Sequence, residues 1–184
     1  IQRASMWDNP SMGTPDFYHR CAGAGPCTTC VPNYLTDGFQ EPHAGDGYIA
    51  MFTTWLTQTS SIDYREYTQA PLNRPLIGGE VYLFTMYIVM ADGCQNGSSV
   101  PQIYFSDDEF FEGTVGGYYD LTPQIDFDTV ITETENWIEL SMCYTATGNE
   151  KYITIGNFLE HDEMRFRPVS QNTGEEHPYY LIDD

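Results

Sequence analysis

The sequence predicts an all-β protein, most simply a jelly-roll β-sandwich, and three observations point to this fold class. The chain contains 14 tyrosines and 10 phenylalanines, and together with 16 glycines and 11 prolines these favour strands and turns over helices. Strand-like runs recur roughly every ten to fifteen residues from about position 34, and turn sequences such as "NRPLIGGE" and "TATGNE" separate them. No segment shows a convincing helical period, and about eight short strands of this kind are typical of a sandwich.

Each expected strand has its own signal. In "WIELSMCYT" the apolar residues Ile138, Leu140, Met142 and Tyr144 alternate and share one face. The continuous apolar run "VYLFTMYIVM" at residues 81–90 indicates a strand buried on both faces. The remaining expected strands are "GYIAMFTTW" (47–55), "YREYTQA" (64–70), "VPQIYF" (100–105), "QIDFDTVIT" (124–132), "KYITIGNF" (151–158), "MRFRPV" (164–169) and "PYYLID" (178–183).

Residues 1–33 differ from the rest of the chain. They contain Cys21, Cys27 and Cys30 with glycines and prolines and little periodicity. We therefore expect an irregular N-terminal arm or pinned loop over residues 1–33 and a β-sandwich over residues 34–184. With 41% apolar residues, the chain can bury a sizeable core as one domain.

The chain is strongly acidic, with a formal net charge of −20. This charge repels phosphate backbones and anionic lipids, which argues against nucleic acid and membrane-surface partners. No apolar run is long enough to cross a bilayer, so we expect no membrane insertion. The five cysteines and the start at Ile1 fit a processed protein in an oxidising exterior, and we expect the protein to be secreted, either extracellular or at a cell surface.

Several stretches together resemble one group of proteins: "GTPDFYHRC", "YREYTQAPLNRPLIGGEVYLFTMYIVMAD", "WIELSMCYTATGNEKYITIGNF" and "YYLIDD". In this order they resemble the secreted cell-surface proteins of gliding, Bacteroidetes-type bacteria, over residues 13–184. The resemblance implies a jelly roll similar to a carbohydrate-binding module. Members of this group usually open with a strand of the type Asn-Leu-x-x-Asn-x-x-Phe-Glu and close with Asp-Asp-Val-x-Val.

The departures from that pattern suggest a hypothesis about assembly. The opening strand is absent, and the closing strand is cut short at Asp184. Without these two strands, one edge of the sheet would carry unpaired backbone N–H and C=O groups. This leaves two alternatives: the sequence is a fragment, or a neighbouring chain completes the edge. In the second case copies of the protein assemble head-to-tail into a filament by strand donation. The assembly residues would be Ile1, Met6 and Trp7 in the donor arm and Tyr179, Tyr180, Leu181 and Ile182 in the acceptor strand.

The cysteines and the terminal acids are candidates for covalent and metal sites. Disulfides are expected among Cys21, Cys27, Cys30, Cys94 and Cys143, with one thiol left over and a Cys94–Cys143 bridge feasible. A zinc site at His19, Cys21, Cys27 and Cys30 is the alternative for the first three cysteines. The resemblance further implies a structural Ca²⁺ at Asp183 and Asp184, whose glutamate partner is absent here.

Aromatic and glycosylation motifs point to sugars. Polysaccharide binding requires exposed aromatic rings beside polar groups. The candidate rings are Trp55, Tyr64, Tyr67, Phe110, Phe111, Tyr118 and Tyr119, of which Trp55, Phe110, Phe111, Tyr118 and Tyr119 are favoured. Asn96-Gly97-Ser98 is an N-glycosylation sequon, and Asp128-Thr129-Val130 resembles the O-glycosylation pattern of the same bacterial group, with Thr129 as acceptor.

Catalysis has weak support, because hydrolase motifs of the G-x-S-x-G and H-E-x-x-H types are absent. Asp126 and Asp128 share one face of an expected strand and are the only suggestion of a glycoside hydrolase pair. The sequence therefore predicts a non-catalytic extracellular structural protein, a surface fibre subunit built by strand donation. The alternative is a carbohydrate-binding module of a larger secreted protein, and a glycoside hydrolase is the weakest interpretation.

Overall fold

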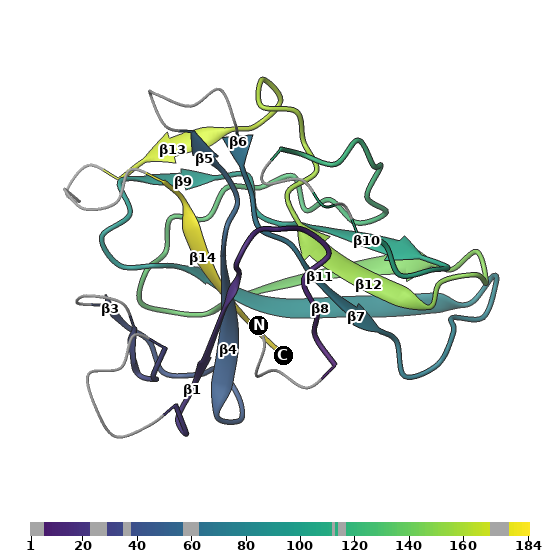
Figure 1. Ribbon diagram of the computed structural model, residues 1–184, viewed down its shortest axis with the longest axis horizontal. Coiled ribbons are helices and arrows are strands. Elements are labelled where there is room, and N and C mark those ends of the chain that lie inside the picture. Colours follow the sequence, from purple (N-terminus) through teal and green to yellow (C-terminus); the bar gives the residue numbers. More distant parts are fainter. Residues whose placement is uncertain are drawn as a thin grey trace.

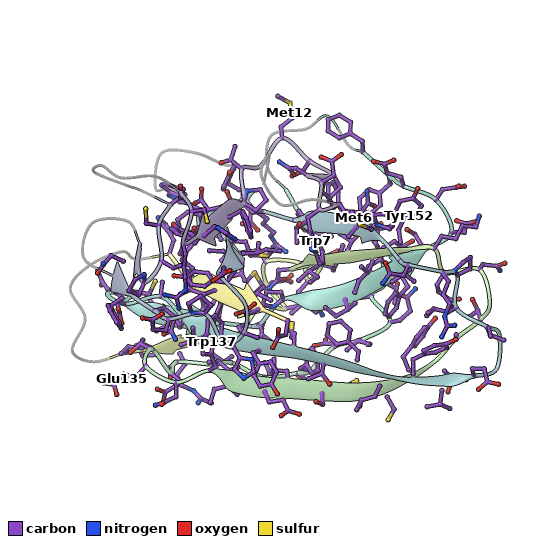
Figure 2. All side chains as sticks on the ribbon, turned by 90° about the horizontal axis from the view of Figure 1, so that it is seen from below. Met6, Trp7, Met12, Glu135, Trp137 and Tyr152 are labelled. Atoms are coloured by element: carbon purple, nitrogen blue, oxygen red, sulfur yellow. The ribbon has the colours of Figure 1, made fainter. Side chains whose placement is uncertain are left out.

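The computed structural model describes residues 6–22, 29–34, 38–56, 63–111, 113, 117–169 and 177–184. These residues form strands, turns and irregular connections, and no helix occurs among them. The two largest sheets lie in separate layers, one above the other in Figure 2, so the predicted all-β sandwich is confirmed. No segment within the described ranges forms a helix that could span a membrane.

The larger layer is a five-stranded antiparallel sheet with the strand order β1-β4-β14-β8-β11. Its second and third strands come from distant parts of the chain and lie side by side in Figure 1. The strands are β1 (Asp16–His19), β4 (Gly47–Phe52), β14 (Tyr179–Asp183), β8 (Val81–Met90) and β11 (Ile138–Thr145).

The smaller layer is a three-stranded antiparallel sheet in which β12 (Tyr152–Gly156) lies between β10 (Gln102–Ser106) and β7 (Thr68–Pro71). Three short two-stranded pairs extend the loops around the sandwich. These pairs are β13 (Phe166–Pro168) with β9 (Asn96–Ser98), β2 (Asn33–Tyr34) with β3 (Gly38–Phe39), and β5 (Trp55–Leu56) with β6 (Asp63–Tyr64).

The core lies between the two sheets and follows the predicted alternation on β11. The side chains of Ile138, Leu140, Met142 and Tyr144 pack against the core, and the intervening residues of β11 are exposed. The ring of Tyr144 stacks on Phe105 of the opposite sheet at 4.9 Å between centroids. The prediction for β8 was only partly right: its last three residues are buried, but Val81 and Leu83 are exposed on the outer face.

Strand β14 lies inside the large sheet and does not form an open edge. It pairs with β4 from Tyr179 to Ile182 and with β8 from Tyr180 to Asp183. The hydroxyl of the fully buried Tyr180 donates to the carbonyls of Ser98 (2.9 Å) and Ile131 (2.7 Å). The expectation that Tyr179, Tyr180, Leu181 and Ile182 await a strand from a neighbouring chain is therefore wrong, since both edges of this strand are already paired.

The described part of the predicted N-terminal arm belongs to the sandwich. Strand β1, which lies within residues 1–33, pairs with β4 at the edge of the large sheet. Asp8 forms a β-bridge with Gln69 of β7. Trp7, which is labelled in Figure 2, packs against the core. Met6 is 59% exposed, and Ile1 lies outside the described residues. The pairing and packing of residues 7 and 8 within their own chain removes the basis for a free donor arm.

The turn after β11 is held by one buried carboxylate. Glu150 accepts hydrogen bonds from the Tyr144 hydroxyl (2.5 Å), the Thr147 N–H (2.6 Å) and the Gly148 N–H (2.8 Å). Burial works against ionisation of Glu150, but these hydrogen bonds outweigh it and lower its pKa to about 2. The carboxylate thus stabilises both the turn and the end of the β11 strand.

We expect the Glu150→Gln variant to lose about 1–2 kcal/mol of unfolding free energy at neutral pH, because the amide cannot accept all of these bonds. The folded pKa lies below the usual value of 4.5, so the stabilisation is complete above that pH and is lost as the pH falls toward 2. Denaturant unfolding of both proteins between pH 7 and pH 2 measures this. The two curves should converge at low pH, and a constant gap would contradict the role assigned to the carboxylate.

Candidate functional site

Three partly exposed rings meet where β5 pairs with β6. Trp55 lies opposite Tyr64 in the register of these strands, and the two rings contact edge to face at 6.1 Å between centroids. The ring of His177, just before β14, lies 5.2 Å from Trp55. The Phe52 ring lies 4.8 Å from Trp55 and separates it from the buried Tyr179. We call the group of Trp55, Tyr64 and His177 the Trp55 surface.

A buried carboxylate fixes this surface from below. Glu66 is 2% exposed and accepts hydrogen bonds from the Tyr64 hydroxyl (2.7 Å) and from the N–H of Phe52 (2.8 Å) and Thr14 (3.1 Å). Burial raises the pKa of Glu66, although the Phe52 and Tyr64 hydrogen bonds oppose that rise. Burial also raises the pKa of Tyr64, which keeps this phenol protonated and able to donate. The Tyr64 ring is therefore held in place before any ligand arrives, and the Trp55 ring packs on Phe52, whose N–H is bound by the same carboxylate.

The chemistry of the Trp55 surface suits a sugar. Aromatic rings bind the C–H face of a pyranose, and adjacent polar groups pair with its hydroxyls. The exposed Thr14 hydroxyl lies 3.2 Å from the Tyr64 hydroxyl, and the His177 ring adds a further polar group beside Trp55. Because the rings are fixed by packing and hydrogen bonds, binding costs little ordering of side chains.

The other predicted aromatic residues do not join this surface. Tyr67 and Tyr119 are 1% and 4% exposed and form a second small core with Phe158, so neither offers a face to a ligand. Phe110 packs edge-on against Tyr119 at 5.5 Å. The expectation of a platform at Tyr119 is thus wrong, whereas Phe111 is 66% exposed and remains available.

Tyr118 lies on the other side of β6. Consecutive strand residues point to opposite faces, so Asp63 faces away from the Trp55 surface while its neighbour Tyr64 joins it. Asp63 pairs with the fully buried Arg65, whose guanidinium lies 5.6 Å from the centre of the Tyr118 ring. The Tyr118 hydroxyl donates to Glu160 (2.9 Å), and this hydrogen bond raises the pKa of Tyr118. The structure therefore separates Tyr118 from Trp55.

The acidic pair at the end of β14 is occupied by groups of the same chain. Asp183 accepts hydrogen bonds from the N–H of His43 (2.7 Å) and of Ala44 (3.1 Å), and Asp184 bonds the His43 ring (2.7 Å). Burial raises the pKa of Asp183. Among the described residues no group of three or more His, Cys, Asp or Glu side chains is arranged to hold a metal ion. Calcium binding at Asp183 and Asp184 stays a prediction.

The cysteines differ from the expected disulfide framework. Cys30 is disulfide-bonded, whereas Cys21, Cys94 and Cys143 carry thiols. Cys143 points outward from β11 and Cys94 is buried, so the feasible Cys94–Cys143 bridge does not form. Cys27 lies outside the described residues. A disulfide at Cys30 also removes a thiolate that the alternative zinc site with His19 and Cys21 requires.

The predicted catalytic residues Asp126 and Asp128 lie in an irregular segment and not on a strand. Both carboxylates already have partners: Asp126 accepts a hydrogen bond from Gln102 (2.8 Å), and Asp128 forms an ion pair with Arg165 (2.7 Å).

Of the predicted glycosylation residues, Asn96 begins β9. Ser98 of its sequon is fully buried, and its hydroxyl lies 2.6 Å from that of Thr53. Thr129 is partly buried, with its carbonyl bonded to the N–H of Val100.

His177 was missed as a member of the Trp55 surface, and Phe52 and Thr14 were missed as its neighbours, because the three residues come from separate segments. Only Trp55 and Tyr64 carried a usable signal, namely aromatic residues flanking a turn-like stretch. A second group of rings was also missed: His43 stacks on Tyr87 at 3.5 Å between centroids and contacts Trp137 edge-on at 6.4 Å. The sequence spacing of these three residues gives no indication that they meet.

No protein-family model matches the chain, and no curated protein matches it. Among solved structures, the chain is similar to the CBM22-1–GH10 modules of endo-1,4-β-D-xylanase 10B from Clostridium thermocellum, complexed with xylohexaose (15% identity, TM-score 0.45). That likeness covers 97% of this chain and 25% of the other, so the chain spans about a quarter of the length of the xylanase structure.

The chain is also similar to the K1 cleaved adhesin domain of Lys-gingipain from Porphyromonas gingivalis W83 (9% identity, TM-score 0.43) and to the K2 domain of Lys-gingipain (14% identity, TM-score 0.43). Each of these likenesses covers 98% of this chain and 88% of the adhesin domain. At this level of similarity the neighbours carry no functional argument, and the function of the chain is inferred from its own side chains.

Proposed function

We propose that this protein is a non-catalytic, extracellular domain that binds a neutral polysaccharide through the Trp55 surface. The observation that carries the proposal is the group of partly exposed rings of Trp55, Tyr64 and His177, fixed by Phe52 and by the buried Glu66. A sugar chain lying across these rings gains apolar contact from the aromatic faces and hydrogen bonds from the adjacent polar groups.

The charge of the chain narrows the class of ligand. A net charge of −20 repels uronic acids, sulfated glycans and phosphate-bearing polymers at low salt, which favours an uncharged polysaccharide. The disulfide at Cys30 supports an oxidising, extracellular location. The engagement of Asp126 with Gln102 and of Asp128 with Arg165 supports binding without hydrolysis, because neither carboxylate is disposed as a free acid or nucleophile.

The test is binding to soluble neutral polysaccharides, with xylan, mixed-linkage glucan and mannan as probes, by affinity gel electrophoresis and calorimetry. We expect the Trp55→Ala variant to lose at least about tenfold in affinity for the polysaccharide that the native chain binds, because the central ring is removed. Circular dichroism and a denaturation midpoint check that the variant is folded.

The matched control is Phe111→Ala. This change also removes an aromatic ring, but one that is more exposed and lies outside the Trp55 surface. This control should keep the native affinity. Retention of binding in Trp55→Ala together with loss in Phe111→Ala would place the site elsewhere, and no binding to any neutral polysaccharide would overturn the proposal.

A further inference from the structure

Three exposed rings lie on the side of β6 that faces away from the Trp55 surface. Tyr118 and Phe166 are 37% and 44% exposed, and half of the His161 side chain is exposed. The His161 ring lies 6.0 Å from the Phe166 ring between centroids, and its Nδ1 atom lies 3.8 Å from the Asp63 carboxylate. The strands β6 and β13, which carry Asp63 and Phe166, lie at the same end of the molecule, at the top of Figure 1. We call the group of Tyr118, His161 and Phe166 the Tyr118 surface.

The Arg65–Asp63 pair joins the Tyr118 ring to the other two rings. The guanidinium of the fully buried Arg65 lies over the Tyr118 ring, 5.6 Å from its centre. The same guanidinium binds the Asp63 oxygen that lies nearest to His161. The Tyr118 hydroxyl donates to Glu160 (2.9 Å), the residue before His161. Tyr118 and His161 are therefore neighbours in space, although they are far apart in the sequence.

Backbone hydrogen bonds fix the segments that carry these rings. The N–H of Gly117 donates to the Asp63 carbonyl (2.6 Å), which sets the position of Tyr118 beside β6. The N–H of Met164 donates to the Glu160 carbonyl (3.2 Å) and closes the turn that begins there. Because both segments are tied to the rest of the fold, a ligand that binds here orders few side chains.

The chemistry of the Tyr118 surface suits a neutral sugar. Arg65 covers one face of the Tyr118 ring, which leaves the other face and the exposed Phe166 ring for the C–H groups of a pyranose. The exposed carboxylate of Glu160 and the ring nitrogens of His161 are polar partners for the hydroxyls of the sugar. The charge of Glu160 and the net charge of −20 both repel an anionic ligand.

We propose that the Tyr118 surface is a second binding surface for neutral polysaccharide. It lies on the opposite side of β6 from the Trp55 surface, because Asp63 and Tyr64 are consecutive residues of that strand. One domain therefore holds two sugar segments at once and links polysaccharide chains to one another. This second surface presupposes the function proposed above, since its ligand belongs to the same class.

Equilibrium dialysis with a labelled hexasaccharide, cut from the xylan, mixed-linkage glucan or mannan that the native chain binds, counts the surfaces. We expect about two hexasaccharides per native chain and about one in each of the variants Trp55→Ala and Tyr118→Ala, because each change removes one aromatic platform. Light scattering of the native chain mixed with the polysaccharide should rise as chains are linked. Each single variant should still bind the polysaccharide but lose most of that rise.

Phe166→Ala locates the second surface without altering the Tyr118 ring, which contacts the buried Arg65. We expect this change to weaken the second site by about fivefold or more, because it removes an exposed ring from the platform. Phe39→Ala is the matched control, since it removes a 56% exposed phenylalanine of β3 outside both surfaces and should leave both sites unchanged. A denaturation midpoint for each variant checks that it is folded.

The possible outcomes separate the two surfaces. A single hexasaccharide per native chain, lost in Trp55→Ala and retained in Tyr118→Ala and Phe166→Ala, would overturn the second surface and leave the proposed function intact. Binding that is lost in Tyr118→Ala and Phe166→Ala but unchanged in Trp55→Ala would support the Tyr118 surface and overturn the Trp55 surface. No binding of any hexasaccharide or polysaccharide by the native chain would overturn both.

Discussion

Replacing Arg65 by methionine is expected to lower the free energy of unfolding by about 3–5 kcal/mol, because the change removes the guanidinium that neutralises the poorly solvated carboxylate of Asp63. Arg65 is fully buried, and its Nε and Nη2 atoms donate to Asp63 at 3.0 and 2.5 Å. Its Nη1 atom donates to the carbonyl of Asn157 at 3.0 Å and to that of Leu159. The guanidinium thus joins β6 to the segment after β12, and methionine fills the space without any of these bonds.

Arg20→Met is the control for this prediction. Arg20 also pairs with two carboxylates, Glu41 at 2.6 Å and Asp46 at 3.6 Å, but its side chain is 45% exposed. Its removal should change the free energy of unfolding by no more than about 1 kcal/mol. Denaturant unfolding measures both variants, and equal losses would show that burial of the Arg65–Asp63 pair is not what makes it important.

A double variant separates the pair from its surroundings. Adding Asp63→Asn to Arg65→Met removes the carboxylate charge that Arg65 no longer neutralises, so the combined loss should be smaller than the sum of the two single losses. Additive losses would contradict a direct coupling between the two side chains.

The second large effect is expected at Gly156, where alanine should lower the free energy of unfolding by about 3 kcal/mol. A Cβ atom at this position of β12 would lie 2.0 Å from Cδ1 and 2.6 Å from Cε1 of Tyr67. The ring cannot move aside easily, because Tyr67 is 1% exposed and its hydroxyl donates to the Asn157 carbonyl at 2.6 Å. Adding a methyl group to this packed contact displaces the ring or the strand.

Gly113→Ala is the matched control for Gly156→Ala, because among the described residues a Cβ at Gly113 meets only Phe111, at an ordinary distance of 3.6 Å. This control should unfold within about 0.5 kcal/mol of the native chain. Combining Gly156→Ala with Tyr67→Ala opens the necessary space, so the double variant should lose less than the sum of the single variants. Thermal or denaturant unfolding that shows no loss for Gly156→Ala alone would contradict the close contact.

Strand positions could be predicted from the sequence where alternation or β-branched runs were strong. The face of β11 that carries Ile138, Leu140, Met142 and Tyr144 was predicted correctly, because hydrophobic alternation depends only on the local pleat. The segment around Asp126 was predicted as a strand, but its apolar residues Ile125 and Val130 each form a single β-bridge, and Asp128 adopts a positive φ of 48° between them. Local pattern does not reveal whether a partner strand is in reach.

The neighbours of a strand were not predictable in the same way. "YYLID" gave a strand signal, but nothing in those letters states that β4 and β8 lie on either side of it. The Trp55 surface illustrates the same limit, because its members Trp55, Tyr64 and His177 are far apart in the sequence. Buried polar contacts such as Arg65 with Asp63 also depend on tertiary structure, since the sequence alone marks both residues as surface charges.

The position of β14 has a consequence for the time at which the domain folds during synthesis. The strands β4 and β8 become neighbours of one sheet only through residues 179–183, which are made long after both of them. Until that segment leaves the ribosome the two halves of the large sheet remain separate, and the long sequence separation slows their joining. The large sheet of a nascent chain therefore stays incomplete until the last of its strands has been made, whereas β7, β10 and β12 of the smaller sheet are available earlier.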